Sequence, residues 1–174
     1  MDKQQVRQAA VEAAAALGPD DAQGLHYARI DQGGRVVLDT SLALDLSYPR
    51  DPQLLLAPEG PHHLGLLSRQ DDHYMLHYGR LDDEGELSDL TAVSRSDEDV
   101  ESFQLLRSLD GGVRAVWASE FDDGRSGIYQ RTLSGSDGQD AVLLVPDGAD
   151  PFVLIDGTAS DGGREAHMVW SDRT

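Results

Sequence analysis

His77-Tyr78-Gly79-Arg80-Leu81-Asp82 is the stretch that decides the fold, because the chain repeats it. A related stretch, His26-Tyr27-Ala28-Arg29-Ile30-Asp31, lies 51 positions upstream, and Ile128-Tyr129-Gln130-Arg131-Thr132 lies 51 positions downstream. A spacing that is kept twice without a gap is typical of a tandem repeat, in which each copy is one supersecondary unit. The repeat predicts an architecture and leaves the chemistry open.

Each complete repeat contains four strand-like runs. Residues 52–94 align with residues 103–145 at the same offset, and ten of these 43 positions are identical. In the second unit the runs are 103–107, 113–119, 127–133 and 140–145, and Asp- and Gly-rich turns separate them. Apolar runs of this length with such turns predict antiparallel strands. The identical pairs are Gln53/Gln104, Leu54/Leu105, Leu55/Leu106, Gly60/Gly111, Ser68/Ser119, Asp71/Asp122, Asp72/Asp123, Tyr78/Tyr129, Arg80/Arg131 and Asp89/Asp140.

Four strands in a unit of about 51 residues are typical of a β-propeller blade. We expect an all-β propeller-type repeat domain over residues 25–174, with three blade equivalents. The last two strands of a blade lie at 25–48, full blades lie at 52–95 and 102–146, and the first two strands of a blade lie at 151–174. Residues 1–18 predict a short N-terminal helix, because Asp2 can cap an alanine-rich run with apolar residues on one face.

Three blades are too few to close a ring, since propellers have four to eight. Two arrangements resolve this. In one, two chains exchange their half-blades and complete a six-bladed ring as a homodimer. In the other, the chain is a segment of a longer propeller whose remaining blades are missing.

The totals exclude several classes of function. Asp and Glu number 32 against 14 Lys and Arg, and the formal charge of -18 disfavours nucleic acid as a partner. The chain has no cysteine, so thiolate catalysis and zinc-cysteine sites are excluded. No apolar run approaches the ~20 residues that span a bilayer, and the N-terminus lacks the layout of a signal peptide. We expect no membrane insertion, and the sequence assigns no compartment.

One blade resembles a known family. The run Val113-Arg114-Ala115-Val116-Trp117-Ala118-Ser119, followed by Asp122-Asp123-Gly124 and Ile128-Tyr129, is similar to blades of sialidase-like (Asp-box, BNR-type) and TolB-like propellers. The resemblance implies a fold, and function depends on the site. The Asp-box order Ser/Thr-x-Asp-x-Gly-x-x-Trp is not met, and no catalytic residue of a sialidase can be carried over. We therefore assign no catalytic residue.

The Tyr/Arg pairs are the candidate ligand-binding residues: Arg29, Arg80, Arg131, Tyr78 and Tyr129. Residues two apart on a strand lie on one face, so each pair projects together. A ring of such arginines would bind an anionic ligand such as a carboxylate sugar. The structural alternative is a tyrosine packed between blades and an arginine paired with a neighbouring turn, and repetition in every copy favours this alternative.

Other candidates have structural explanations that we favour. Trp117 and Trp170 take equivalent strand positions and would serve as core or as sugar-stacking platforms. Acidic turns could hold Ca²⁺, although the alternating Asp ladder of an EF-hand is absent. These turns comprise Asp71, Asp72, Glu120, Asp122 and Asp123. The histidines His62, His63, His73 and His77 are not part of the repeat, and we assign no metal site and no cofactor to them.

The sequence thus favours a non-catalytic propeller module that binds or scaffolds, with a glycan or another protein as ligand. One alternative is part of a sialidase-like glycoside hydrolase. Another is a structural unit that assembles through its half-blades, either closing a ring or forming an open filament.

Overall fold

A computed structural model describes residues 24–57, 59–107, 112–133, 140–156 and 165–172. The described residues form an all-β structure, and no helix occurs among them. The predicted N-terminal helix at 1–18 lies outside the described residues. No helix in the described part of the chain is long and apolar enough to cross a membrane.

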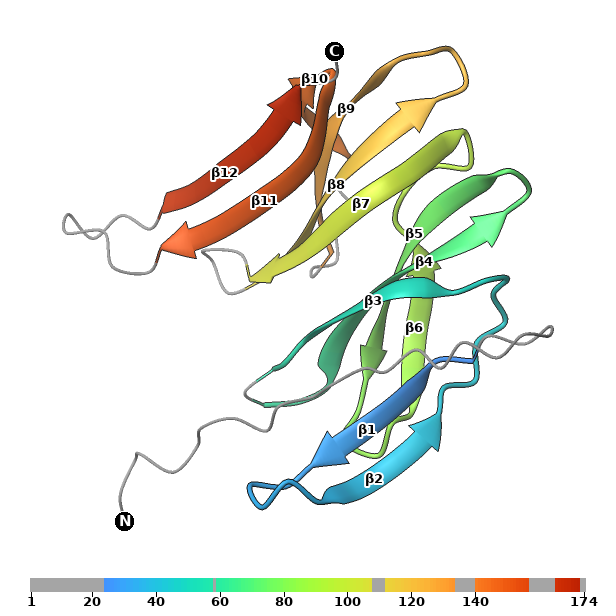
Figure 1. Cartoon of the computed structure of the whole chain (residues 1–174), viewed down its shortest axis with the longest axis vertical. Helices are drawn as coiled ribbons and strands as arrows, with labels where there is room; N and C mark the ends of the chain where they lie inside the picture. The colour runs from blue at the N-terminus through green and yellow to red at the C-terminus, as the bar shows by residue number, and fades with distance from the viewer. Residues whose placement is uncertain (1–23, 58, 108–111, 134–139, 157–164, 173–174) are drawn as a thin grey trace.

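The strands form two four-stranded sheets flanked by two hairpins, all antiparallel and none closed on itself (Figure 1). Within each sheet the strand order follows the chain. The leading hairpin contains β1 (His26–Ile30) and β2 (Val36–Ser41), and the trailing hairpin contains β11 (Gly148–Asp156) and β12 (Glu165–Asp172). The first sheet contains β3 (Arg50–Leu55), β4 (His62–Gln70), β5 (His73–Leu81) and β6 (Leu87–Ala92). The second sheet contains β7 (Glu98–Arg107), β8 (Val113–Phe121), β9 (Ser126–Thr132) and β10 (Val142–Pro146).

These strands correspond to the predicted repeat runs, with shifted ends. The largest difference is β7, which begins at Glu98 and not at the predicted Phe103. Its first residues are mostly acidic and lie outside the predicted run, but Glu98 pairs with Phe121 and Asp99 with Glu120 along β8. The extension brings two carboxylates into the sheet.

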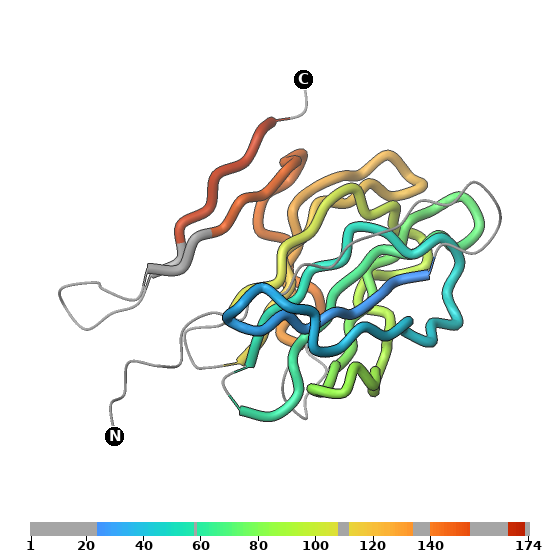
Figure 2. Tube along the Cα trace, turned by 60° about the horizontal axis from the view of Figure 1, so that its bottom comes forward, coloured from blue at the N-terminus to red at the C-terminus, as the bar shows by residue number. Residues whose placement is uncertain are grey.

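The four layers stack in chain order, with an apolar core between each pair (Figures 1 and 2). Tyr27 and Leu25 pack with Leu64, Leu66 and Leu81 between the leading hairpin and the first sheet. The two four-stranded sheets enclose the largest core, which includes Leu67, Leu76, Tyr78, Phe103, Val113 and Trp117. Val116, Ile128 and Val153 form the third core, against the trailing hairpin. Burial between layers explains why the inner strands are apolar on both faces.

Two glutamines at equivalent repeat positions join each four-stranded sheet to the layer that follows it. The Gln53 side chain donates to Phe103 O at 2.6 Å and accepts from Leu105 N at 3.0 Å. The Gln104 side chain donates to Val153 O at 3.1 Å and accepts from Val153 N at 2.8 Å. Both repeats therefore use an amide to satisfy backbone groups on the first strand of the following layer.

The trailing hairpin departs from this scheme at Phe152. Gln53 lies opposite Gly65, Gln104 opposite Val116, and Phe152 opposite Val169, so Phe152 occupies the glutamine position of the third copy. In all three first strands the pairing register shifts upstream of this position, which indicates a β-bulge; the shifts lie between Arg50 and Gln53, between Val100 and Ser102, and between Ala149 and Phe152. Hence the equivalence of the three copies extends to their irregularities.

The two complete sheets differ in register by one residue. Gly65 pairs with Tyr78 in the first sheet, whereas in the second sheet Tyr129 pairs with Trp117 and not with Val116. The connecting turns differ accordingly. Gln70 and His73 flank the two residues Asp71 and Asp72, but Glu120 and Ser126 flank five residues. A one-residue shift reverses the face to which a side chain points. Tyr78 and Tyr129 consequently enter the same core from opposite sheets.

Candidate functional site

The strongest candidate site is an acidic hollow where the turns of the first and second sheets meet. It has a volume of about 260 Å³ and is lined by Asp72, His73, Asp99, Glu120, Phe121, Asp122 and Gly124. His73 begins β5, Asp99 lies on β7, and Glu120 lies near the end of β8. Four carboxylates and one histidine face this hollow, and no lysine or arginine lines it.

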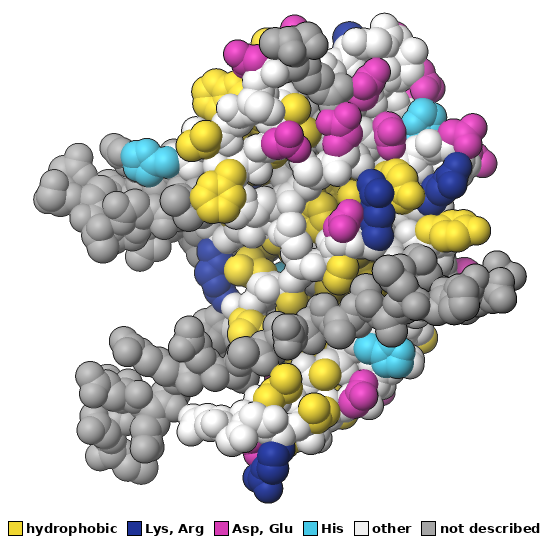
Figure 3. All heavy atoms as spheres, viewed as in Figure 1, with side chains coloured by type: hydrophobic (Ala, Val, Ile, Leu, Met, Phe, Trp, Pro, Cys, Tyr) yellow, Lys and Arg dark blue, Asp and Glu magenta, His cyan; other side chains and the backbone are white. Residues whose placement is uncertain are grey.

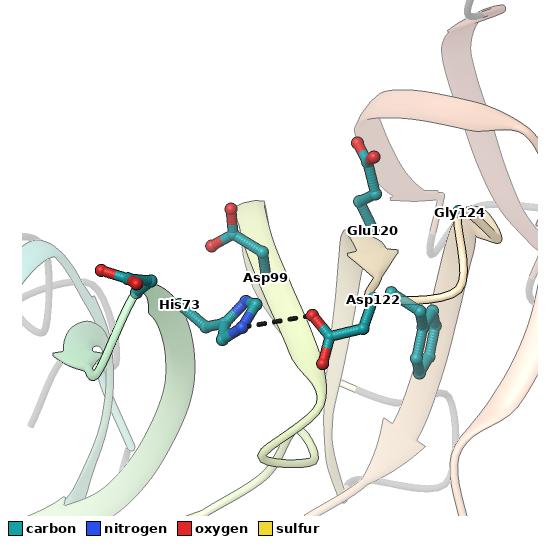
Figure 4. Close-up of a pocket in the computed structure, with 7 residues that line it drawn as sticks. His73, Asp99, Glu120, Asp122 and Gly124 are labelled. Atoms are coloured by element: carbon teal, nitrogen blue, oxygen red, sulfur yellow. Dashed lines mark ion pairs between the residues drawn. The ribbon is translucent and has the colours of Figure 1, made fainter.

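Cross-strand pairing places two of these carboxylates side by side. Asp99 lies directly opposite Glu120 in the antiparallel pairing of β7 and β8, and residues opposite each other project from the same face of a sheet. In Figure 4 both carboxyl groups rise from neighbouring strands on the same side of the hollow. The N–H of Tyr74 donates to Asp99 Oδ1 at 2.8 Å, which fixes that carboxylate against the first sheet.

An ion pair joins the two sheets across the hollow. His73 Nε2 lies 3.3 Å from Asp122 Oδ1, and Figure 4 shows the imidazole ring pointing toward this carboxylate. The Asp122 side chain is 69% exposed, so water screens the pair and reduces its contribution to stability. Asp72, from the turn of the first sheet, is more exposed still. The hollow thus presents accessible negative charge.

The Phe121 ring, which lines the hollow, lies close to two arginine side chains. The Arg125 guanidinium lies 5.0 Å from the centre of the Phe121 ring, and that of Arg95 lies 5.8 Å from it. Phe121 packs edge-on against Tyr129 at 5.5 Å. Cation–π attraction therefore already occurs at the rim, which is the kind of contact a basic side chain of a partner would make.

The predicted arginine ring does not converge on one ligand site in this structure. Arg29 donates to Asp83 O at 3.3 Å, and Arg131 donates to Val93 O at 2.9 Å. Each guanidinium thus contacts a backbone carbonyl next to a strand end of the first sheet, while Arg80 is exposed. These contacts agree with the structural alternative of arginines that join layers.

The two candidate tyrosines lie in the core between the sheets. The Tyr78 hydroxyl is 2.8 Å from His63 Nδ1, and its pKa is raised, chiefly because burial disfavours the phenolate. Tyr129 stacks on Trp117 with ring centres 6.1 Å apart, and burial likewise raises its pKa. Trp117 is buried, so it is core and not a sugar-stacking platform.

The four histidines have separate partners. His62 Nε2 is 3.3 Å from Asp83, His63 contacts Tyr78, and His77 Nε2 is 2.8 Å from Ser68 Oγ. His73 contacts Asp122. Within the described ranges, no three His, Asp or Glu side chains are arranged to hold a metal ion.

The acidic turns carry local pairs of their own. The Arg125 N–H donates to Asp123 Oδ1 at 3.1 Å and Arg125 Nε donates to Asp123 Oδ2 at 2.7 Å, and these two contacts lower the pKa of Asp123. Arg69 lies 3.4 Å from Asp72. The sequence pattern indicates the turn aspartates and Glu120 as candidates but not Asp99, because the predicted strand begins at Phe103 while β7 begins at Glu98.

The comparisons with known proteins give no relative. No family model, no curated protein and no solved structure matches this chain.

Proposed function

We propose that the chain is a non-catalytic, β-propeller-type module that binds a basic segment of another protein in the hollow between its two four-stranded sheets. The propeller assignment is supported by four-stranded antiparallel sheets that stack face to face in chain order, with a core between each pair of layers.

The observation that carries the choice of ligand is the cross-strand pair Asp99 and Glu120. Like charges directly opposite each other destabilise a sheet. The pair lies at the edge of a hollow next to Asp72 and Asp122, and a cationic group bound in the hollow would be attracted by all four carboxylates. Lysine and arginine side chains supply such a group and extend far enough to enter a hollow of this size.

The charge of the whole chain supports the same partner. The formal net charge is -18, and Asp and Glu outnumber Lys and Arg on the face shown in Figure 3. Such a field attracts basic partners and accelerates their association at low ionic strength. Sugar binding by stacking has less support at this site, because Trp117 is buried and Phe121 is packed against Tyr129.

The test measures binding and stability on the same variant. A fluorescein-labelled hexa-arginine peptide is titrated with the wild type, with Glu120→Gln and with Glu59→Gln, a matched control at an exposed loop position. We expect Glu120→Gln to weaken binding about two- to fivefold, which corresponds to about 0.5–1 kcal/mol. The free energy of unfolding of the same variant is measured by urea denaturation, so that weaker binding caused by partial unfolding is recognised.

Equal weakening in both variants would show a general charge effect and would overturn the assigned site. Release of a fluorophore from a fluorogenic sialoside by the wild type would overturn the non-catalytic assignment.

A further inference from the structure

The two hairpins are complementary halves of one four-stranded sheet. In each complete sheet the strands follow one another in chain order. Phe152 of β11 pairs with Val169 of β12. The equivalent pairs join the first and second strands of the complete sheets: Gln53 with Gly65, and Gln104 with Val116. β11 and β12 are therefore equivalent to a first and second strand. β1 carries the Tyr27 and Arg29 repeat of β5 and β9, so β1 and β2 are equivalent to a third and fourth strand.

Each half leaves unpaired, among the described residues, the strand edge that is paired at the centre of a complete sheet. β12 pairs only with β11, and β1 pairs only with β2. β12 forms the outer edge of the stack in Figures 1 and 2. Leu42 N donates to Leu25 O, so the N–H and C=O of Leu25 point toward β2. Successive residues of an antiparallel strand point these groups alternately toward and away from the partner, so those of His26 and Ala28 point away from β2, to the free edge. Unpaired edges of this kind are templates for another strand.

Burial shows which strand β12 lacks. The register makes Trp170 equivalent to Leu66 and Trp117, which are both 0% exposed, yet Trp170 is 44% exposed. Trp117 is covered by Tyr129 of the adjoining third strand, and Trp170 has no such neighbour among the described residues. Phe152 and Val169 are also exposed, at 55% and 68%, and hydrophobic side chains show at the surface over this hairpin in Figure 3.

We propose that β1 of a second copy pairs with β12, and that the exchange is reciprocal, so that two copies close into one ring of six four-stranded sheets. Each copy contributes two complete sheets and two halves, and the two pairs of halves make the remaining sheets. Six lies within the range of known propellers. The contact is the same on both copies, which a two-fold axis requires. This assembly does not depend on the acidic hollow.

The facing of side chains, together with the equivalence of β12 to β4, fixes the register of the pairing. Residues opposite each other in an antiparallel pair share a face. Tyr27 points toward the first sheet, away from the start of the stack. On β12 the corresponding face is that of Val169, because Met168 packs in the opposite direction with Val153. Tyr27 therefore lies opposite Val169, and His26 lies opposite Trp170, as Tyr78 lies opposite Gly65 and His77 opposite Leu66.

The first experiment measures the mass of the wild type by sedimentation equilibrium at about 1 M salt. At this salt concentration the Debye length is about 3 Å, so repulsion between two acidic copies is screened. The expected mass is twice the chain mass of 18.9 kDa. A mass of one chain would overturn the proposal, and an open series of heavier species would overturn the closed ring.

A proline variant tests the edge itself. Ala28→Pro removes an N–H that faces the free edge and leaves the hydrogen bonds of Tyr27 and Arg29 to β2 in place. We expect Ala28→Pro to be monomeric with an unchanged circular dichroism spectrum, and Ala28→Gly, which keeps the N–H, to remain a dimer. A dimeric Ala28→Pro would overturn the pairing.

Cysteine pairs test the register, because the chain contains no cysteine of its own. In a hydrogen-bonded antiparallel pair the Cα atoms are about 5.5 Å apart, which suits a disulfide. His26→Cys with Trp170→Cys should give a covalent dimer on a non-reducing gel. The control, His26→Cys with Val169→Cys, places the two side chains on opposite faces and should stay uncrosslinked. The reverse outcome would overturn the register.

Discussion

The Trp117 indole donates a hydrogen bond of 3.2 Å to Glu98 Oε2 in the core between the two four-stranded sheets. Ser119 Oγ lies 3.4 Å from the same oxygen, and Glu98 is almost fully buried. Burial raises the pKa of Glu98, and the hydrogen bonds from Trp117, Ser119 and the backbone offset this only in part. A buried acid held by two neutral donors thus lies at the centre of the stack.

Glu98→Gln should make the protein more stable at neutral pH. A raised pKa means that the folded state binds the proton of Glu98 more tightly than the unfolded state does. The stability that Glu98 contributes to the fold is therefore present below about pH 4.5, and it is lost as pH rises through the folded pKa. Glutamine keeps an acceptor for Trp117 without a charge to desolvate, and we expect a gain of about 1–3 kcal/mol at pH 7. Urea unfolding at several pH values checks this. The exposed Glu59→Gln should leave the pH dependence unchanged, and equal curves for Glu98→Gln and the wild type would contradict the expectation.

His77 should act in the opposite direction. Burial lowers its pKa, so the folded state favours the neutral ring, and stability is present above about pH 6.5 and is lost as pH falls. His77→Gln should therefore reduce the loss of stability between pH 7 and pH 5. Ser68→Ala removes the 2.8 Å contact to His77 but keeps the titration, so it should cost about 1 kcal/mol while the histidine-dependent pH slope remains. Thermal denaturation at both pH values separates the two effects, and a wild-type slope in His77→Gln would refute the assignment.

The two glutamines that tie the layers should each protect a different strand. Gln104→Leu leaves the N–H and C=O of Val153 without partners, and Gln53→Leu does the same for Leu105 N and Phe103 O. We expect each change to cost about 1–3 kcal/mol. In hydrogen exchange, Gln104→Leu should accelerate the Val153 amide and Gln53→Leu the Leu105 amide, so each variant is the control for the other. Identical exchange patterns would be inconsistent with separate ties.

A side chain at Gly65 should destabilise the core between the two four-stranded sheets. A Cβ at this position would lie 2.8 Å from Phe103 Cε2 and 2.9 Å from Leu105 Cδ1, inside the core between the sheets. Gly65→Ala should cost about 1–3 kcal/mol from overpacking. Adding Phe103→Leu should recover part of this loss, because it removes the nearer of the two contacts. Gly24→Ala, where nothing lies within 4 Å, should be neutral in the same unfolding assay. Equal stability of the two alanine variants would show that the layers can separate to admit the methyl group.

The repeat predicted the four-stranded units well, because short apolar runs and Asp/Gly turns are local signals. The register was not predictable in the same way. Tyr78 and Tyr129 align in sequence, but their side chains point to opposite faces of their sheets. The reason is that the β4–β5 turn has two residues between paired strand ends, whereas the β8–β9 turn has five. An ungapped spacing of 51 gives no sign of this difference.

The candidate site was only partly foreseen for a related reason. Asp72 and Asp122 were read correctly as turn residues. Asp99 belongs to an acidic run that lacks strand propensity, and it joins β7 because β8 offers a partner along its whole length. Tertiary pairing overrides local preference in such a segment. The four histidines lie close together in the sequence but do not form a cluster in the fold. Each contacts a different partner on a neighbouring strand or turn.

Phe152 has a consequence for how the stack ends. Inside the chain, Gln53 and Gln104 each join a four-stranded sheet to the following layer through hydrogen bonds to backbone N–H and C=O groups. At the last layer a phenyl ring occupies the glutamine position, and an apolar contact depends weakly on the alignment of the two surfaces. The sheet face at the end of the stack therefore offers a neighbour an apolar ring to bury, while the Gln53 and Gln104 contacts within the chain are directional.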